Sequence, residues 1–140
     1  DFTNRLVIQK QRFNAMGVNY NPSATPPQIA SWMPAQITTS YSTLTWDISS
    51  SITNAGEIDL SFCWKSGANG LDIAWAALLA DGVEMDRDTH AGFTGVTPSK
   101  PTYILRLPAH KPGTIYTLKA SAAGRGGTDS TGVVYRTTWN

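Results

Sequence analysis

Residues 70–88 read GLDIAWAALLADGVEMDRD. At the centre of this stretch, Asp81-Gly82 separates two strand-like runs, and a type I′ turn favours this pair because both of its central positions need positive φ. In the first run, the larger apolar residues Leu71, Ile73 and Trp75 alternate with smaller or polar residues. This alternation has the period of a strand with one buried face. The stretch therefore predicts a β-hairpin.

Further strand-like runs occur on both sides of the hairpin, with turn-forming residues between them. They are Thr43–Ile48, Glu57–Lys65, Tyr103–Leu107, Tyr116–Ala122 and Gly132–Thr138. Strand-length runs at regular spacing are typical of a sandwich or jelly roll rather than of βαβ units. We therefore expect an all-β jelly-roll β-sandwich of about seven or eight strands over residues 43–140.

The hairpin stretch also resembles the central hairpin of galactose-binding-like jelly rolls, in which alternating apolar positions lead into an Asp-Gly turn. The resemblance covers Gly70–Asp88 and implies a galactose-binding-like jelly roll. That fold hosts many carbohydrate-binding modules and also purely structural accessory domains. The fold alone therefore does not give the function.

The first twenty residues have a different pattern. Phe2, Leu6, Phe13 and Met16 recur at helical spacing, and Gly17 stands where a helix C-cap glycine belongs. We expect one amphipathic helix over residues 1–20. Such a helix needs another surface to be stable, so we interpret it as the tail of a preceding domain in a longer protein.

Residues 21–42 are rich in Pro, Ser and Thr, which favours a connector. Trp32, Met33 and Ile37 are too apolar for a free linker. We therefore expect this segment to pack along the domain surface or to form an edge strand.

The segment Arg12–Pro22, RFNAMGVNYNP, resembles the end of the catalytic barrel in family 20 glycoside hydrolases, the β-N-acetylhexosaminidases. In that family a final helix runs into a similar Gly-Val-Asn-Tyr segment, which Gly17–Tyr20 match. Asn21 departs from the pattern, because a basic residue is common at its position. The resemblance implies that residues 1–20 are the last helix of such a barrel.

A second resemblance covers residues 45–135 and agrees with the first. DRDTHAGFTG (86–95), GRGGTDSTG (124–132) and AGEIDLSFCWKSGANGLDI (55–73) resemble the β-sandwich that follows the barrel in some bacterial hexosaminidases. The matching positions are Asp88, His90, Gly92, Thr94 and Gly95, then Tyr103, Leu105, Leu107 and Pro108, then Gly124, Gly126, Gly127, Thr128, Asp129, Ser130 and Gly132. The resemblance implies an accessory domain of a β-N-acetylhexosaminidase.

Candidate sugar-binding residues lie in and near these polar clusters. Asp86, Asp88 and His90 are spaced two apart, so they share one face of an extended strand. Sugar hydroxyls are bound by carboxylate, guanidinium and imidazole groups, often beside an aromatic ring. The candidate polar contacts are Asp86, Asp88, His90, Arg125 and Asp129, and the candidate aromatic platforms are Trp75, Phe93 and Tyr103.

Two other interpretations of the same residues stay open. Asp88 or Asp129 can cap backbone N–H groups of a loop, with His90 hydrogen-bonded to a carboxylate. Alternatively, Asp129, Thr128 and loop carbonyls can supply oxygens to a structural Ca²⁺. Trp75 likewise has two interpretations, because tryptophans within strand patterns fill the core of a small sandwich more often than they bind ligands.

Composition and motifs argue against several classes of function. The formal charge is +1 and only 15% of the residues are charged, which gives no basic stripe for nucleic acid. No run of apolar residues is long enough to span a membrane. The single cysteine, Cys63, cannot form an internal disulfide and is expected to be a structural thiol. Zinc ligand spacing, a nucleophile elbow, a Walker loop and a dinucleotide-binding fingerprint do not occur.

Catalysis by this chain itself is not expected. Family 20 hydrolysis uses an Asp-Glu pair in the barrel, which this sequence lacks, and the one Asp-x-Asp here places both carboxylates on one strand. We therefore interpret the chain as a non-catalytic module that binds N-acetylhexosamine- or galactose-containing glycans for its parent enzyme, outside the cytoplasm. The expected partners are this carbohydrate and the catalytic barrel of the same polypeptide. The alternative is a structural domain that packs on that barrel without binding sugar.

Overall fold

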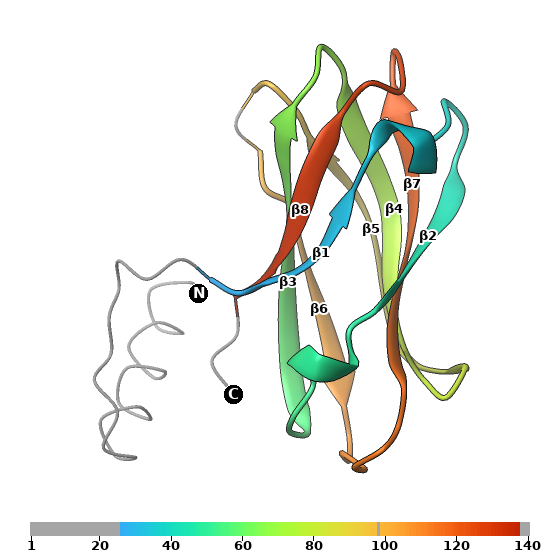
Figure 1. Ribbon diagram of the computed structural model, residues 1–140, viewed down its shortest axis with the longest axis vertical. Coiled ribbons are helices and arrows are strands. Elements are labelled where there is room, and N and C mark those ends of the chain that lie inside the picture. Colours follow the sequence, from blue (N-terminus) through green and yellow to red (C-terminus); the bar gives the residue numbers. More distant parts are fainter. Residues whose placement is uncertain (1–25, 98, 138–140) are drawn as a thin grey trace.

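The computed structural model describes residues 26–97 and 99–137, and these form two four-stranded antiparallel sheets packed face to face (Figure 1). We name them sheet A and sheet B. Sheet A has the order β1 (Gln28–Trp32), β8 (Thr131–Arg136), β3 (Gly56–Ser66) and β6 (Thr102–Leu107). Sheet B has the order β2 (Ser42–Asp47), β7 (Tyr116–Arg125), β4 (Gly70–Ala80) and β5 (Val83–Thr94). Two short 3₁₀ helices, η1 (Pro34–Gln36) and η2 (Ser49–Ser51), flank β2 along the chain.

The all-β sandwich predicted from the sequence is confirmed, and so is its central hairpin. Strands β4 and β5 meet at Asp81 and Gly82, whose φ angles are +47° and +82°. Both values are positive, as the predicted turn type requires. The carboxylate of Asp81 also accepts a hydrogen bond from the backbone N–H of Ile115 at 2.9 Å, which ties the turn to the segment before β7.

The helix expected over residues 1–20 lies outside the described residues. Within the segment expected as a connector, residues 28–32 form β1, which pairs with β8 at the edge of sheet A. This is the second of the two arrangements expected for that segment. Trp32, at the end of β1, is fully buried. The described sandwich therefore begins at residue 28 and not at residue 43.

Among the described helices, none has the length and apolar character needed to cross a bilayer.

The core between the sheets is centred on aromatic rings. The ring of Phe62 lies 5.6 Å from that of Tyr103 in an edge-to-face arrangement, and 6.4 Å from that of Trp32. Such tilted pairs are favoured over parallel sandwich stacking. Trp46 packs on the same cluster at 6.5 Å from Phe62. Cys63 is free and buried.

A register slip in β4 decides which side chains face this core. Leu71 and Ile73 point inward, but the pairing of β4 with both neighbours shifts between Ile73 and Trp75. After the slip, Ala76 and Leu78 point inward instead. The expectation that Trp75 shares the core phase of Leu71 and Ile73 is therefore wrong, because a β-bulge adds one residue and exchanges the two faces. Trp75 lies on the side of sheet B that faces away from the core.

The first prediction concerns the close packing of Gly132 against Trp32. A Cβ atom added at Gly132 meets the ring of Trp32 at 2.1 Å and the carbonyl oxygen of Cys63 at 2.6 Å. Because Trp32 is fully buried, its ring has no open space to enter. Gly132→Ala is expected to lower the free energy of unfolding by about 1–3 kcal/mol, measured by urea denaturation.

Gly113→Ala is the matched control. Gly113 has open space around its Cβ position but a φ of +84°, so alanine there costs only left-handed backbone strain, about 1 kcal/mol. A loss at Gly132 no larger than that at Gly113 contradicts the packing argument.

Candidate functional site

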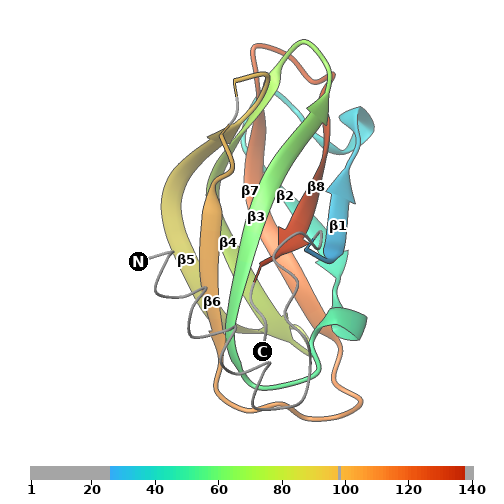
Figure 2. The same ribbon diagram turned by 90° about the vertical axis from the view of Figure 1, so that its left-hand side faces the viewer.

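The residues predicted to bind sugar fall into three separate places, and the first is a seam between the two sheets. Strand β5 at the edge of sheet B lies beside β6 at the edge of sheet A (Figure 2). The carboxylate of Asp88 accepts a hydrogen bond from the backbone N–H of Ile104 at 2.8 Å. Asp86 accepts one from the N–H of Arg106, also at 2.8 Å. Two carboxylates thus accept hydrogen bonds from alternate backbone N–H groups along the edge of β6 that is not paired with β3.

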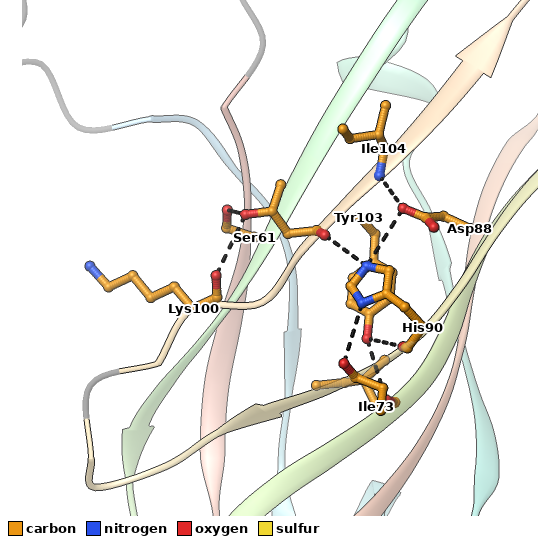
Figure 3. Close-up of polar contacts among 9 residues, drawn as sticks. Ser61, Ile73, Asp88, His90, Lys100, Tyr103 and Ile104 are labelled. Carbon is orange, nitrogen blue, oxygen red and sulfur yellow. Dashed lines mark hydrogen bonds and ion pairs between the residues drawn. The ribbon is translucent and has the colours of Figure 1, made fainter. Parts of the chain in front are cut away.

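His90 continues this seam by one more step. Its Nε2 lies 3.0 Å from the carbonyl oxygen of Thr102 and 3.6 Å from the carboxylate of Asp88. Its ring stacks on that of Tyr103, with 4.0 Å between centroids (Figure 3). Asp86, Asp88 and His90 share one face of β5, as predicted. For this reason they contact backbone groups at every second residue of β6.

Tyr103 connects the seam to the register slip. Its single hydroxyl hydrogen is shared between the carbonyl oxygens of His90 at 2.9 Å and Ile73 at 3.3 Å (Figure 3). These two carbonyls lie where the β4–β5 pairing shifts. Burial raises the pKa of Tyr103 above its ordinary value. With 0% of its surface exposed, Tyr103 offers no ring face to a ligand, and its prediction as an aromatic platform is corrected here.

Asp129 lies in the second place, a loop clamp between β7 and β8. One carboxylate oxygen accepts the backbone N–H of Ala68 at 2.7 Å, and the other accepts the N–H and the Nδ2 of Asn69 at 3.0 and 3.1 Å. These hydrogen bonds, of which the one from Ala68 has the largest effect, hold the pKa of Asp129 below its ordinary value. Asp129 therefore caps the loop between β3 and β4, as one of the two alternative interpretations proposed.

The calcium interpretation of Asp129 and Thr128 stays a prediction. Three N–H donors point at the Asp129 carboxylate, whereas a Ca²⁺ site needs six to eight oxygens around the ion. Across residues 26–97 and 99–137, no cluster of three or more His, Cys, Asp or Glu side chains is arranged to hold a metal ion.

The third place is the outer face of sheet B, which is the face opposite to the core. Phe93 on β5 and Asp72 on β4 lie opposite each other there. The guanidinium of Arg125 stacks over the Phe93 ring, with Cζ 4.0 Å from the centroid. It also forms a two-bond ion pair with Asp72, at 3.1 Å from Nε and 2.6 Å from Nη2. The hydrogen bond to Asp72 raises the pKa of Arg125.

A second stack of the same composition lies farther along β4. The guanidinium of Arg87 lies 3.8 Å from the centroid of the Trp75 ring. Its Nε and Nη2 donate to one carboxylate oxygen of Glu84 at 3.0 and 2.7 Å. Each stack therefore joins an aromatic ring, a guanidinium and a carboxylate. We name them the Phe93 stack (Phe93, Arg125, Asp72) and the Trp75 stack (Trp75, Arg87, Glu84).

Small and hydroxyl-bearing residues surround the two stacks on this face. They are Thr43 and Thr45 on β2, Thr117, Ser121 and Ala123 on β7, and Ala77 on β4, and the long cationic side chain of Lys119 on β7 lies among them. Tyr41 is exposed and lies near enough to Arg125 to interact with it electrostatically. The outer face thus combines aromatic rings, paired charges and hydroxyl groups.

The structure brings together three of the eight predicted residues, Trp75, Phe93 and Arg125, on this outer face. Sequence reasoning missed Asp72, Glu84 and Arg87, which complete the stacks. A signal for Arg87 existed, since it lies between Asp86 and Asp88 and so on the opposite face of the strand.

Neither a protein-family model nor a curated protein matches this chain.

The seam generates the second prediction. Removing the Asp88 side chain leaves the partly buried N–H of Ile104 without its acceptor. Asp88→Ala is expected to lower the free energy of unfolding by about 1–2 kcal/mol, measured by urea denaturation at neutral pH.

Asp88→Asn is the control, because an amide oxygen can accept the same N–H. It is expected to lose less stability than Asp88→Ala. If Asp88→Ala unfolds at the wild-type urea midpoint, the carboxylate does not hold the seam.

The third prediction concerns acid stability and Asp129. Because the folded-state pKa of Asp129 is depressed, its stabilisation is present above the unfolded pKa and is lost as pH falls through the folded value. Asp129→Asn is therefore expected to be less stable than wild type at about pH 7, and the difference is expected to shrink below about pH 4. Urea midpoints of both proteins across this range test the prediction. A difference that stays constant with pH contradicts it.

Proposed function

We propose that this domain is a non-catalytic carbohydrate-binding module of a bacterial family 20 β-N-acetylhexosaminidase, and that it binds glycans on the outer face of sheet B. The observation that carries the proposal is the pair of stacks, each with a ring, a guanidinium and a carboxylate. The sequence resemblance to hexosaminidases supports the parent enzyme. Such an enzyme acts on glycans outside the cytoplasm, so we propose that location for the module.

The chemistry of the stacks suits a sugar. A pyranose ring offers C–H groups on its faces and hydroxyl groups around its rim. Aromatic rings pack against the apolar faces, while carboxylate and guanidinium groups bind hydroxyls in the plane of the rim. In each stack the guanidinium covers one face of the ring, so a sugar would contact the ring edge and the outer plane of the guanidinium. Binding there would raise the effective concentration of the parent enzyme at its substrate.

Each guanidinium also keeps a donor for a ligand. Arg87 and Arg125 both use Nε and Nη2 on their carboxylates. This leaves each Nη1 without a partner among the described residues. Since its partner carboxylate holds the group in place, little side-chain entropy would be lost when a ligand accepts the Nη1 hydrogen bonds.

We also propose that the sandwich is a jelly roll. Consecutive described strands alternate between sheet A and sheet B except at the β4–β5 hairpin. This strand order supports two Greek-key turns wound over one sandwich.

A structural accessory role is the second candidate. Two large apolar side chains, Val83 and Ile115, are 64% and 55% exposed near the β4–β5 turn. Exposed apolar side chains at one end of a sandwich suit packing against another domain. This contact and sugar binding use different surfaces, so both roles are compatible.

The fourth prediction tests sugar binding. In an NMR titration of the labelled domain with GlcNAc, GalNAc, galactose and chitobiose, with and without Ca²⁺, saturable shifts are expected at residues of the outer face of sheet B. Trp75→Ala is expected to weaken the binding about tenfold or more, as truncation of a central aromatic contact does.

Tyr135→Ala is the control, because Tyr135 carries Lys65 over its ring at 5.3 Å on sheet A, away from the proposed site. It is expected to bind as wild type does. If no sugar causes saturable shifts at tens of millimolar, the structural accessory role is the better proposal. If the shifts map to sheet A instead, the proposed surface is wrong.

A further inference from the structure

We infer that the outer face of sheet B binds an uncharged oligosaccharide of at least two sugar rings, with the Phe93 stack and the Trp75 stack contacting different rings of one chain. This inference rests on the proposed function, since it specifies the ligand of the same surface. It is carried by the spacing of the two stacks, by their charge balance and by the small residues between them.

Strand pairing sets the spacing. Asp72 lies opposite Ala123 on β7, and Trp75 lies opposite Ser121, two residues away on that strand. Two residues correspond to ~7 Å along the strand, and Phe93 is one strand farther across, at ~5 Å. The two aromatic side chains therefore start roughly 8 Å apart on a diagonal. One pyranose ring is too short to lie on both stacks, whereas neighbouring units of a chain can lie on one each.

The two stacks are also alike in composition. Each has one ring, one guanidinium held by one carboxylate, and one free Nη1 donor. A repeated set of groups fits a ligand with a repeated unit. An oligosaccharide presents the same ring faces and hydroxyl pattern again along its length, which a single sugar or a peptide does not.

Charge argues for a neutral chain. Arg87 is paired with Glu84 and Arg125 with Asp72, so each positive group is neutralised within its own stack. Among the residues that the structure describes, Lys119 is the remaining cation on this face. A polyanion needs a surplus of positive charge along its path, and this face does not offer one. The occupant that complements it is an uncharged polyhydroxyl chain.

The surface between the stacks does not obstruct such a chain. The rows that join them contain Ser121 and Ala123 on β7, and Ala77 follows on β4. These side chains are short, so the aromatic and guanidinium groups project beyond them. Ser121 adds a hydroxyl group where the chain would pass from one stack to the other.

Chain length is the decisive variable in the test. Isothermal titration calorimetry of the domain is done with β-1,4-linked N-acetylglucosamine oligomers of increasing length and, in parallel, with β-1,4-linked galactose oligomers, each series starting from the single sugar. We expect affinity in one series to rise by about tenfold or more from the single sugar to an oligomer that reaches both stacks, and then to level off.

Arginine variants assign the two stacks. Arg87→Ala and Arg125→Ala are each expected to weaken binding of the longer oligomer several-fold, while at most one of them changes binding of the single sugar. Arg87→Lys and Arg125→Lys keep the charge without the planar fork and are expected to lose nearly as much. Arg106→Ala is the control, because Arg106 pairs with Glu57 at 3.2 Å on sheet A and lies over none of the described aromatic rings.

Each contrary result has a distinct meaning. Equal affinity for the single sugar and for every oligomer overturns the inference and leaves the proposed function standing. No saturable binding in either series, nor in the monosaccharide panel, overturns both. Binding of polygalacturonate that is stronger than that of neutral oligomers and disappears at high salt overturns the uncharged ligand, because it shows that charge and not the stacks holds the chain.

Discussion

The slip of one residue in β4, between Ile73 and Trp75, is the constraint on which both faces of sheet B depend. Before the slip, odd-numbered residues of β4 fill the core, and after it even-numbered residues do. At the slip, the single O–H of Tyr103 lies within hydrogen-bond distance of the carbonyl oxygens of both Ile73 and His90. Because buried carbonyls need partners, a tyrosine from the opposite sheet makes the bulge tolerable and thereby places Trp75 on the outer face.

The seam and the bulge support each other through His90. Its carbonyl accepts the hydroxyl of Tyr103, while its ring stacks on Tyr103 and its Nε2 meets Thr102. Tyr103 therefore links β4 and β5 at the slip, and His90 links β5 to β6 along the edge. A free strand edge is a risk for pairing with other chains, and the carboxylates of Asp86 and Asp88 occupy N–H groups on the edge of β6. Strand β5 is therefore fixed to β4 on one side and to β6 on the other, which holds in place the side chains that it carries on the outer face.

Local patterns were enough to predict the elements of this fold. The period of two marked the strands, and Asp81-Gly82 marked the hairpin because few other residues accept positive φ at both positions. The bulge at Trp75 could not be predicted, since strict alternation continues through it in the sequence. For Asp88, one interpretation from the sequence was a backbone N–H partner in a loop, but the N–H belongs to Ile104 on a strand of the other sheet, and a backbone group leaves no side-chain signature that would identify it. Of the residues in the two stacks, Trp75, Phe93 and Arg125 were predicted. Arg87 was missed because its place over Trp75 depends on cross-strand register.

The energetics of the stacks favour a role in binding over a role in stability. Exposed ion pairs contribute about 0–1 kcal/mol, and cation–π contacts at exposed sites about 0.5–1 kcal/mol, so the sandwich does not need either stack to fold. Its core is complete without them, since the rings of Phe62, Tyr103 and Trp32 already join the two sheets. A stack does, however, hold a guanidinium beside a ring with one amino group left over. That arrangement adds little to the stability of the folded domain. It would lower the entropy cost of binding, because the guanidinium is already held in place, and such pre-ordering is expected of a recognition surface.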